Sequence, residues 1–94
     1  PEKIYFKGVI DPDLGLKLEG IKASLEAIAD TDWTLDSIKT TITNQIGDAP
    51  KGPYLHPLRM TLSGRDQSPD PFTIAWIIGK TETMNRIQNI ITLL

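Results

Sequence analysis

A cluster of arginine, proline and acidic residues lies between positions 55 and 71, in the stretch LHPLRMTLSGRDQSPDP. Arg59 and Arg65 are two of the three arginines in the chain. An arginine side chain is a planar fork of N–H donors, which fits a phosphate or the edge of a base. Two prolines then restrict the backbone of the segment Ser68-Pro69-Asp70-Pro71. A rigid loop beside a guanidinium group can hold an unpaired RNA base.

The same residues also have a simpler explanation. Arg59 lies off the apolar face formed by Leu55, Leu58 and Leu62, so its side chain need not pack against the core. Arg65 follows Gly64 just past a predicted helix end, where a cation is favoured by the helix dipole. An ordinary solvated loop is therefore the alternative to an RNA contact.

The sequence gives little support for catalysis. His56 is the only histidine and there is no cysteine, which excludes a His-based metal cluster and a thiolate zinc site. His56 with Ser63 is conceivable as a base and nucleophile, but one such pair is a very weak signal. The acidic pairs at positions 11 and 13 and at 30 and 32 flank predicted helix ends, where Asp caps N–H groups. No phosphate-binding glycine loop occurs. We expect neither a catalytic residue nor a bound metal or cofactor in this chain.

Charge divides the chain into two unequal halves. Residues 1–50 carry five bases and nine acids, whereas residues 51–94 carry five bases and three acids. Because phosphate neutralisation needs Lys and Arg, residues 51–94 are predicted to face RNA and residues 1–50 to supply supporting helices. The 94 residues, 39% hydrophobic and 23% charged, are typical of one globular domain.

Apolar runs in the chain stay well below the ~20 residues that a membrane-spanning helix needs. We expect no secretory signal or presequence, and the lack of cysteine is consistent with a reducing compartment. We therefore expect a cytoplasmic protein without a membrane partner.

Apolar residues at spacings of three and four predict an all-α domain of about five helices. The segments with this periodicity are residues 14–28, 35–46, 55–63, 71–78 and 81–94. Pro57 is expected in the first turn of the third segment and Pro71 at the first position of the fourth. The stretch KIYFKGVI is the only candidate for a strand, and it is short.

Several single residues carry specific expectations. Four helices have predicted N-caps: Asp11 or Asp13 for the first, Thr34 for the second, Ser68 or Asp70 for the fourth, and Thr81 for the fifth. Trp33 and Trp76 lie within helical patterns, so packing is favoured over base stacking for both. Met60 and Met84 are further candidates for the core.

Residues 55–87 resemble the C-terminal anticodon-binding domain of bacterial-type glutamyl-tRNA synthetases. That family typically carries a PLR or PVR triplet, a hydrophobic turn ending in TG, a loop proline, an apolar helix ending in LGK plus E, and an arginine in the last helix. The matching residues here are Pro57-Leu58-Arg59, Leu62-Ser63-Gly64, Pro69, Ile78-Gly79-Lys80 with Glu82, and Arg86. The two upstream helices and the Asp-Trp-Thr turn at 32–34 also suit the family.

The resemblance implies a helical cage that binds the anticodon loop of the glutamate tRNA. It implies that Arg59 and residues 68–71 face the anticodon bases, with Arg65 contacting a phosphate. The sequence departs from the family pattern at Ser63, where threonine is usual, and at Asp70, which places an acid in the RNA-facing loop. Asp70 either accepts from a base amino group or caps the following helix.

The resemblance also implies a longer parent enzyme. The family's HIGH-like and KMSKS-like signatures are absent here, so this chain would position tRNA, while the parent would join glutamate to it with ATP and magnesium. We expect residues 1–94 to be one C-terminal domain, with the remaining synthetase domains N-terminal to Pro1, in a monomer. Whether glutamine tRNA is also bound stays open. A helical protein-interaction module with no RNA role is the alternative function.

Overall fold

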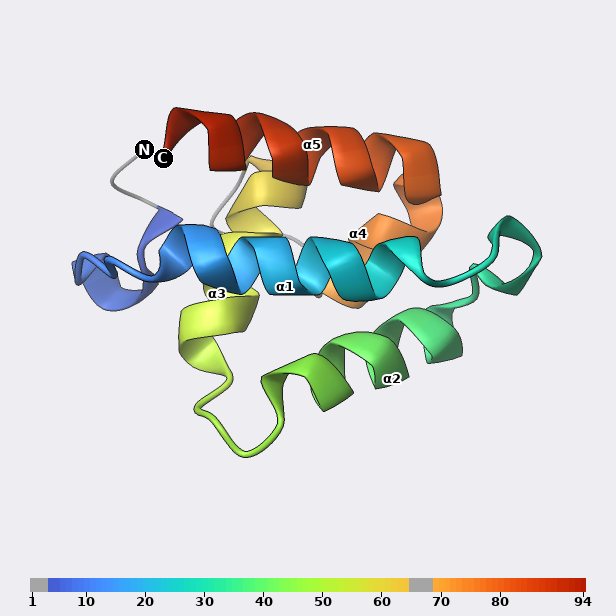
Figure 1. Cartoon of the computed structure of the whole chain (residues 1–94), viewed down its shortest axis with the longest axis horizontal. Helices are drawn as coiled ribbons and strands as arrows, with labels where there is room; N and C mark the ends of the chain where they lie inside the picture. Colours follow the sequence, from blue (N-terminus) through green and yellow to red (C-terminus); the bar gives the residue numbers. More distant parts are fainter. Residues whose placement is uncertain (1–3, 65–68) are drawn as a thin grey trace.

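The computed structural model describes residues 4–64 and 69–94, which contain five α-helices (Figure 1). The helices are α1 (Leu14–Glu26), α2 (Leu35–Ile46), α3 (Gly52–Ser63), α4 (Pro71–Ile78) and α5 (Lys80–Leu93). Two short 3₁₀ turns, η2 (Phe6–Gly8) and η3 (Asp30–Asp32), precede α1 and α2. No strand occurs in these two ranges, so the all-α prediction is confirmed.

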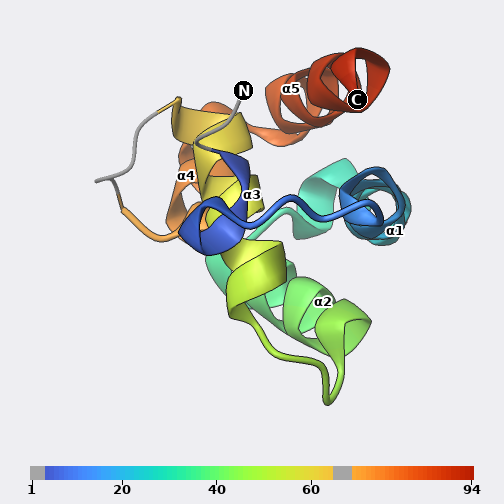
Figure 2. The same ribbon diagram turned by 90° about the vertical axis from the view of Figure 1, so that its left-hand side faces the viewer.

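The helices form two groups around a shared core. α1 packs against α5 and α2, while α3 packs against α4 and α5. Figure 2 shows α1 and α5 on one side of the molecule and α3 and α4 on the other. Most residues of the predicted apolar stripes point inward, whereas Leu35 and Leu94 at the ends of two stripes are exposed. The hydrophobic core contains Ile4, Leu14, Leu18, Ile21, Leu25, Ile38, Ile42, Ile46, Leu58, Leu62, Ile74, Ala75 and Ile87, each with less than a tenth of its surface exposed.

Two helices begin earlier than the periodicity predicts. α3 begins at Gly52, so Pro57 lies inside the helix and the expectation that it sits in the first turn is wrong. Pro53 occupies the first turn instead, where its missing N–H is tolerated. α5 begins at Lys80 with Gly79 as its N-cap, so the predicted cap at Thr81 is also wrong. Gly79 ends α4 and starts α5 at once.

The stretch that was the only candidate for a strand forms the turn η2 instead. Lys7 and Gly8 have φ angles of 56° and 72°, and two successive left-handed residues reverse the chain direction. Further along, Asp13 stands at the N-cap of α1 without a capping side-chain bond, and the carboxylate of Asp11 accepts from the Asp13 N–H at 2.9 Å. The Thr34 side chain caps α2 by accepting from the Ser37 N–H at 3.1 Å, as predicted.

The two tryptophans occupy different environments. Trp33 packs against the core, and its Nε1–H donates to the Ala75 carbonyl at 3.0 Å. Trp76 is 49% exposed on α4, so it lies outside the core and only part of its surface is packed. Met60 and Met84 are half-buried against the core, in agreement with the prediction.

Gly79 provides a direct test of the α4–α5 junction. Its φ of 88° and ψ of 167° lie in a region that is essentially restricted to glycine. A Cβ added at Gly79 or at Gly15 of α1 would meet no atom within 4 Å, so space does not distinguish the two positions. We expect Gly79→Ala to lower the free energy of unfolding by about 1–3 kcal/mol, measured by urea denaturation.

Gly15→Ala is the matched control for this substitution. Gly15 has an ordinary helical backbone, so alanine there should be neutral or should stabilise by up to about 1 kcal/mol. Equal effects of the two substitutions would contradict the assigned junction geometry.

Candidate functional site

The predicted RNA-facing residues map to the end of α3 and the start of α4, two helices that pack against each other. Arg59 lies on α3, Pro69 and Asp70 directly precede α4, and Pro71 is its first residue. Arg65 and Ser68 lie outside the described residues, so their predicted contacts stay predictions. The structure thus brings four of the six predicted residues to two packed helices.

The end of α3 is closed by Gly64. This glycine adopts the left-handed conformation with φ 71°, and its N–H donates to the Met60 carbonyl at 2.7 Å. One residue earlier, the Ser63 hydroxyl donates to the Arg59 carbonyl at 2.7 Å. A threonine hydroxyl can make the same bond one turn back along a helix. The serine that replaces the family's usual threonine therefore preserves the interaction.

Arg59 is a half-buried cation with an unused donor. Its Nε is fully buried and has no hydrogen-bond partner in the described part of the chain. A buried donor without a partner costs about 1–3 kcal/mol. The described residues supply the Arg59 guanidinium with neither an ion pair nor a helix-end carbonyl, so its terminal N–H groups are the part that an external acceptor could reach.

Asp70 acts as the N-cap of α4. One carboxylate oxygen accepts from the Thr73 N–H at 2.9 Å, and the other accepts from the Thr73 hydroxyl at 2.9 Å. Partial burial of the carboxylate opposes ionisation, but these hydrogen bonds outweigh it and lower the pKa of Asp70. Of the two roles open for this acid, capping is the one that the geometry shows. Pro71 follows as the buried first residue of the helix.

Two other cations of the family pattern hold helix ends together. The Lys80 ammonium donates to the carbonyl of Glu26, the last residue of α1, at 3.0 Å, and to that of Ile28, two residues further on, at 2.5 Å. The Arg86 Nη1 donates to the carbonyl of Leu62 in the last turn of α3, and its Nε lies 3.2 Å from a Glu82 carboxylate oxygen. These carbonyls lack intrahelical partners, so Lys80 and Arg86 satisfy them.

Periodicity and motif spacing did not reveal this capping role. The carbonyls are 24 to 54 residues away in sequence from the cations that bind them. Among the motif cations that the structure describes, Arg59 is therefore the one whose side-chain donors are not committed to a helix end.

The geometry gives no support for a catalytic pair or a metal centre. His56 and Ser63 are seven residues apart on α3, a rise of about 10 Å. The Ser63 hydroxyl is bound to the Arg59 carbonyl, and the His56 ring centroid lies 6.1 Å from that of Phe6. Within residues 4–64 and 69–94, no group of three His, Cys, Asp or Glu side chains is placed to hold a metal ion. The helices in the same ranges are all too short or too polar to cross a membrane.

Comparison with known proteins identifies the class to which this helical domain belongs. Residues 6–91 match the family model described as the anticodon binding domain, and the chain belongs to that family. It is 32% identical over 97 aligned positions to the glutamate–tRNA ligase of Bifidobacterium adolescentis, covering 89% of this chain and 19% of that protein. It is 36% identical over 74 positions to the glutamate–tRNA ligase of Clostridium botulinum strain Hall, covering 76% and 15%.

The chain thus spans less than a fifth of the length of these curated relatives. No solved structure matches it. The resemblance seen in the sequence is confirmed at the level of the family.

Removal of the charge should lower the free energy of unfolding much more at Arg86 than at Arg59. Arg86→Met leaves the Leu62 carbonyl without its donor, and we expect a loss of about 1–3 kcal/mol in the free energy of unfolding. Arg59→Met removes a donor that has no partner, so its cost should stay within about 0.5 kcal/mol. Denaturant titration of both variants measures the difference. A larger loss for Arg59→Met would contradict the assigned roles.

The cap at Asp70 should give a pH-dependent contribution to stability. Its pKa is lower in the folded protein than the value of about 3.9 in an unfolded chain. The ionised carboxylate therefore stabilises the fold above pH 3.9, and this contribution is lost as the pH falls through the folded-state pKa. We expect Asp70→Ala to cost about 0.5–2 kcal/mol at pH 7, with a smaller difference from wild type at pH 2–3.

Asp70→Asn is the control, because it keeps a capping acceptor without a titrating group. It should cost less than Asp70→Ala at pH 7. Thermal unfolding of all three proteins across this pH range would measure the effect. A constant difference between wild type and Asp70→Ala from pH 7 to pH 2 would count against the cap.

Proposed function

We propose that this chain is the anticodon-loop-binding domain of a glutamate–tRNA ligase, and that it meets tRNA with the end of α3 and the start of α4. The observation that carries this proposal is the half-buried guanidinium group of Arg59, for which the described residues supply neither an ion pair nor a side-chain hydrogen bond. Lys80 and Arg86 are committed to helix carbonyls, which leaves Arg59 as the motif cation available to a ligand. The family match and the ligases among the relatives support the same assignment.

Arg59 would read the RNA through its guanidinium group. An acceptor on an unpaired base or a phosphate would pair with its terminal N–H groups, because the Nε is buried beneath them. Asp70 and Pro71 would contribute indirectly, because the cap and the buried proline fix where α4 begins. Exposed Pro69 offers an apolar contact beside them, and Arg65 and Ser68 complete the predicted set.

The parent protein in this proposal is a complete ligase. It attaches glutamate to its tRNA with ATP and magnesium, using catalytic residues in domains that precede Pro1, and it acts in the cytoplasm as a monomer. The 94-residue chain itself contributes tRNA binding and no catalytic residue. Glutamate tRNA is the proposed partner, and discrimination against glutamine tRNA is left to residues elsewhere in the parent.

Binding to tRNA with and without the native anticodon tests the proposal. We expect Arg59→Ala in the ligase to raise the Kd for glutamate tRNA about 5- to 150-fold, equivalent to about 1–3 kcal/mol. For a glutamate tRNA with an altered anticodon, wild-type affinity should already be lower and Arg59→Ala should have a smaller further effect. Fluorescence anisotropy at a fixed salt concentration provides the measurement, since salt changes every protein–RNA affinity.

Lys39→Ala is the matched control. Lys39 is an exposed cation on α2, in the acidic half of the chain, so its loss changes net charge equally but should alter the Kd less than twofold. Equal effects of the two substitutions would mean that general electrostatic attraction accounts for the affinity and that Arg59 makes no specific contact. Weak and equal affinity for both tRNAs would favour the protein-interaction alternative instead.

A further inference from the structure

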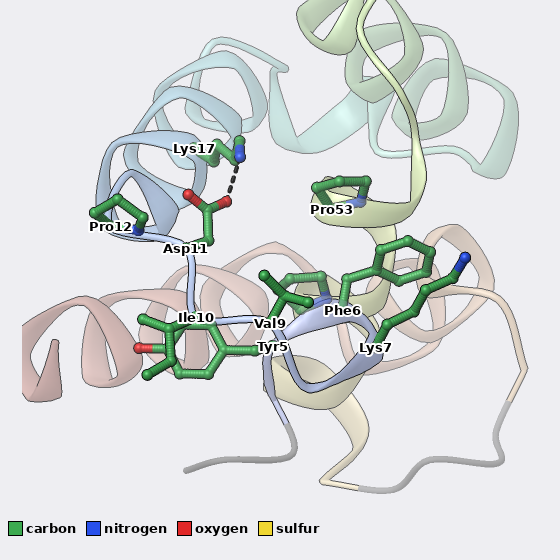
Figure 3. Close-up of a pocket in the computed structure, with 10 residues that line it drawn as sticks. Tyr5, Phe6, Lys7, Val9, Ile10, Asp11, Pro12, Lys17 and Pro53 are labelled. Atoms are coloured by element: carbon green, nitrogen blue, oxygen red, sulfur yellow. Dashed lines mark hydrogen bonds and ion pairs between the residues drawn. The ribbon is translucent and has the colours of Figure 1, made fainter.

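An apolar groove lies between the N-terminal segment and the beginnings of α1 and α3, and Figure 3 draws the side chains that line it. Its volume is about 380 Å³. The apolar side chains that line it include Tyr5, Val9, Ile10, Pro12, Pro53 and Pro57. None of the residues that line the groove is among those proposed to bind RNA, so the occupant of the groove would be a different partner.

The N-terminal segment is firmly attached to the domain beneath it. Ile4 is 93% buried in the core. Phe6 lies against Gly52, where an added Cβ would stand 2.4 Å from the phenyl ring, so only glycine allows this approach. The direction of the chain then reverses at Lys7 and Gly8, both with positive φ. The segment is therefore an integral part of the fold.

Val9 and Ile10 follow this reversal and point away from the core. Val9 is 68% exposed and Ile10 is 74% exposed. After them the chain is fixed again, because Asp11 forms an ion pair with Lys17, drawn as a dashed line in Figure 3. The Lys17 ammonium also lies 5.4 Å from the centroid of the Tyr54 ring. Val9 and Ile10 are thus held outward between two anchored points.

Further apolar side chains are exposed at the same end of the molecule. Leu16 near the start of α1 is 69% exposed, and Leu93 and Leu94 at the end of α5 are 80% and 53% exposed. Figures 1 and 2 place the start of α1, the end of α5 and η2 at one end. Eight large apolar side chains are exposed in the described part of the chain, and five of them lie at this end: Val9, Ile10, Leu16, Leu93 and Leu94. We call these five residues the apolar end.

We propose that the apolar end binds the domain that precedes this chain in the parent ligase. The inference rests on the proposed function, under which this domain is joined to the rest of a ligase. The matched relatives are more than five times longer than the segment they share with this chain, so a large covering surface is available. Tyr5, near the beginning of the described residues, lines the groove, so a connection from a preceding domain would arrive close to the surface that needs covering.

The chemistry of the surface defines what it would bind. An exposed cluster of aliphatic side chains is typical of an interaction site on a soluble protein. Contacts between domains of one chain bury about 600–1,500 Å², which the groove and its aliphatic rim together can supply in part. The expected occupant is an apolar helix or loop face of the neighbouring domain, with Val9 and Ile10 inserted between its side chains.

Thiol labelling in the full-length ligase tests this inference. The chain contains no cysteine, so Ile10→Cys and Ile77→Cys each introduce one thiol into this domain, and peptide mapping separates it from thiols elsewhere. Ile10 and Ile77 are 74% and 67% exposed in this domain by itself, so the two positions are matched in accessibility. We expect maleimide to label Ile10→Cys at least about tenfold more slowly than Ile77→Cys. Val9→Cys should repeat the slow rate and serves if Ile10→Cys does not fold.

Equal labelling rates would overturn the inference. So would protection of Ile10→Cys that disappears on dilution, because a second copy of the protein would then be the occupant. Charging of glutamate tRNA by the same preparations separates the two proposals. A ligase that charges its tRNA but labels equally at both positions contradicts the apolar-end interface alone, whereas a protein that charges no glutamate tRNA contradicts the proposed function.

Discussion

Two cations of α5 bind the C-terminal carbonyls of two other helices, and the position of the site depends on these bonds. Lys80 at the first residue of α5 holds the carbonyls at the end of α1, and Arg86 holds the carbonyl of Leu62 in α3. A helix leaves its last four carbonyls without internal partners, so each needs a donor from elsewhere. α5 thereby fixes the end of α3 relative to α1. Gly79 makes the arrangement possible, since it turns α4 directly into α5.

Under the proposed function, the same bonds would explain how a small domain with a net charge of −2 can present a specific cation to RNA. Charges used in capping are neutralised locally by carbonyl dipoles and by Glu82, and they contribute little to an external ligand. Arg59 lies half-buried on α3, and its Nε has no hydrogen-bond partner in the described part of the chain. Asp70 caps the N-terminus of α4 with its carboxylate, so this acid is compatible with the proposed RNA contact. Under the proposed function, recognition depends on the placement of one side chain more than on overall charge.

The sequence predicted most of the fold because the core stripes of α1 and α2 follow a helical period without interruption. It misplaced the start of α3 because Gly52 and Pro53 have the composition of a loop, although proline is well suited to a first turn. It misplaced the start of α5 because the left-handed backbone of Gly79 is set by the α4–α5 junction and leaves no periodic signal. The family pattern identified Lys80 and Arg86 but gave them no role, since their partners are carbonyls distant in sequence. The exposure of Trp76 likewise depends on which face of α4 meets α2 and α3.

The central claim is that the α3–α4 edge meets the anticodon loop, and photochemical cross-linking tests it most directly. A glutamate tRNA carrying 4-thiouridine in its anticodon loop would be irradiated in complex with the ligase, and the attached peptides would be identified by mass spectrometry. The account predicts cross-links within residues 55–74, which contain Arg59 and the start of α4. Cross-links concentrated on α1 or α2, in the acidic half of the chain, would contradict it.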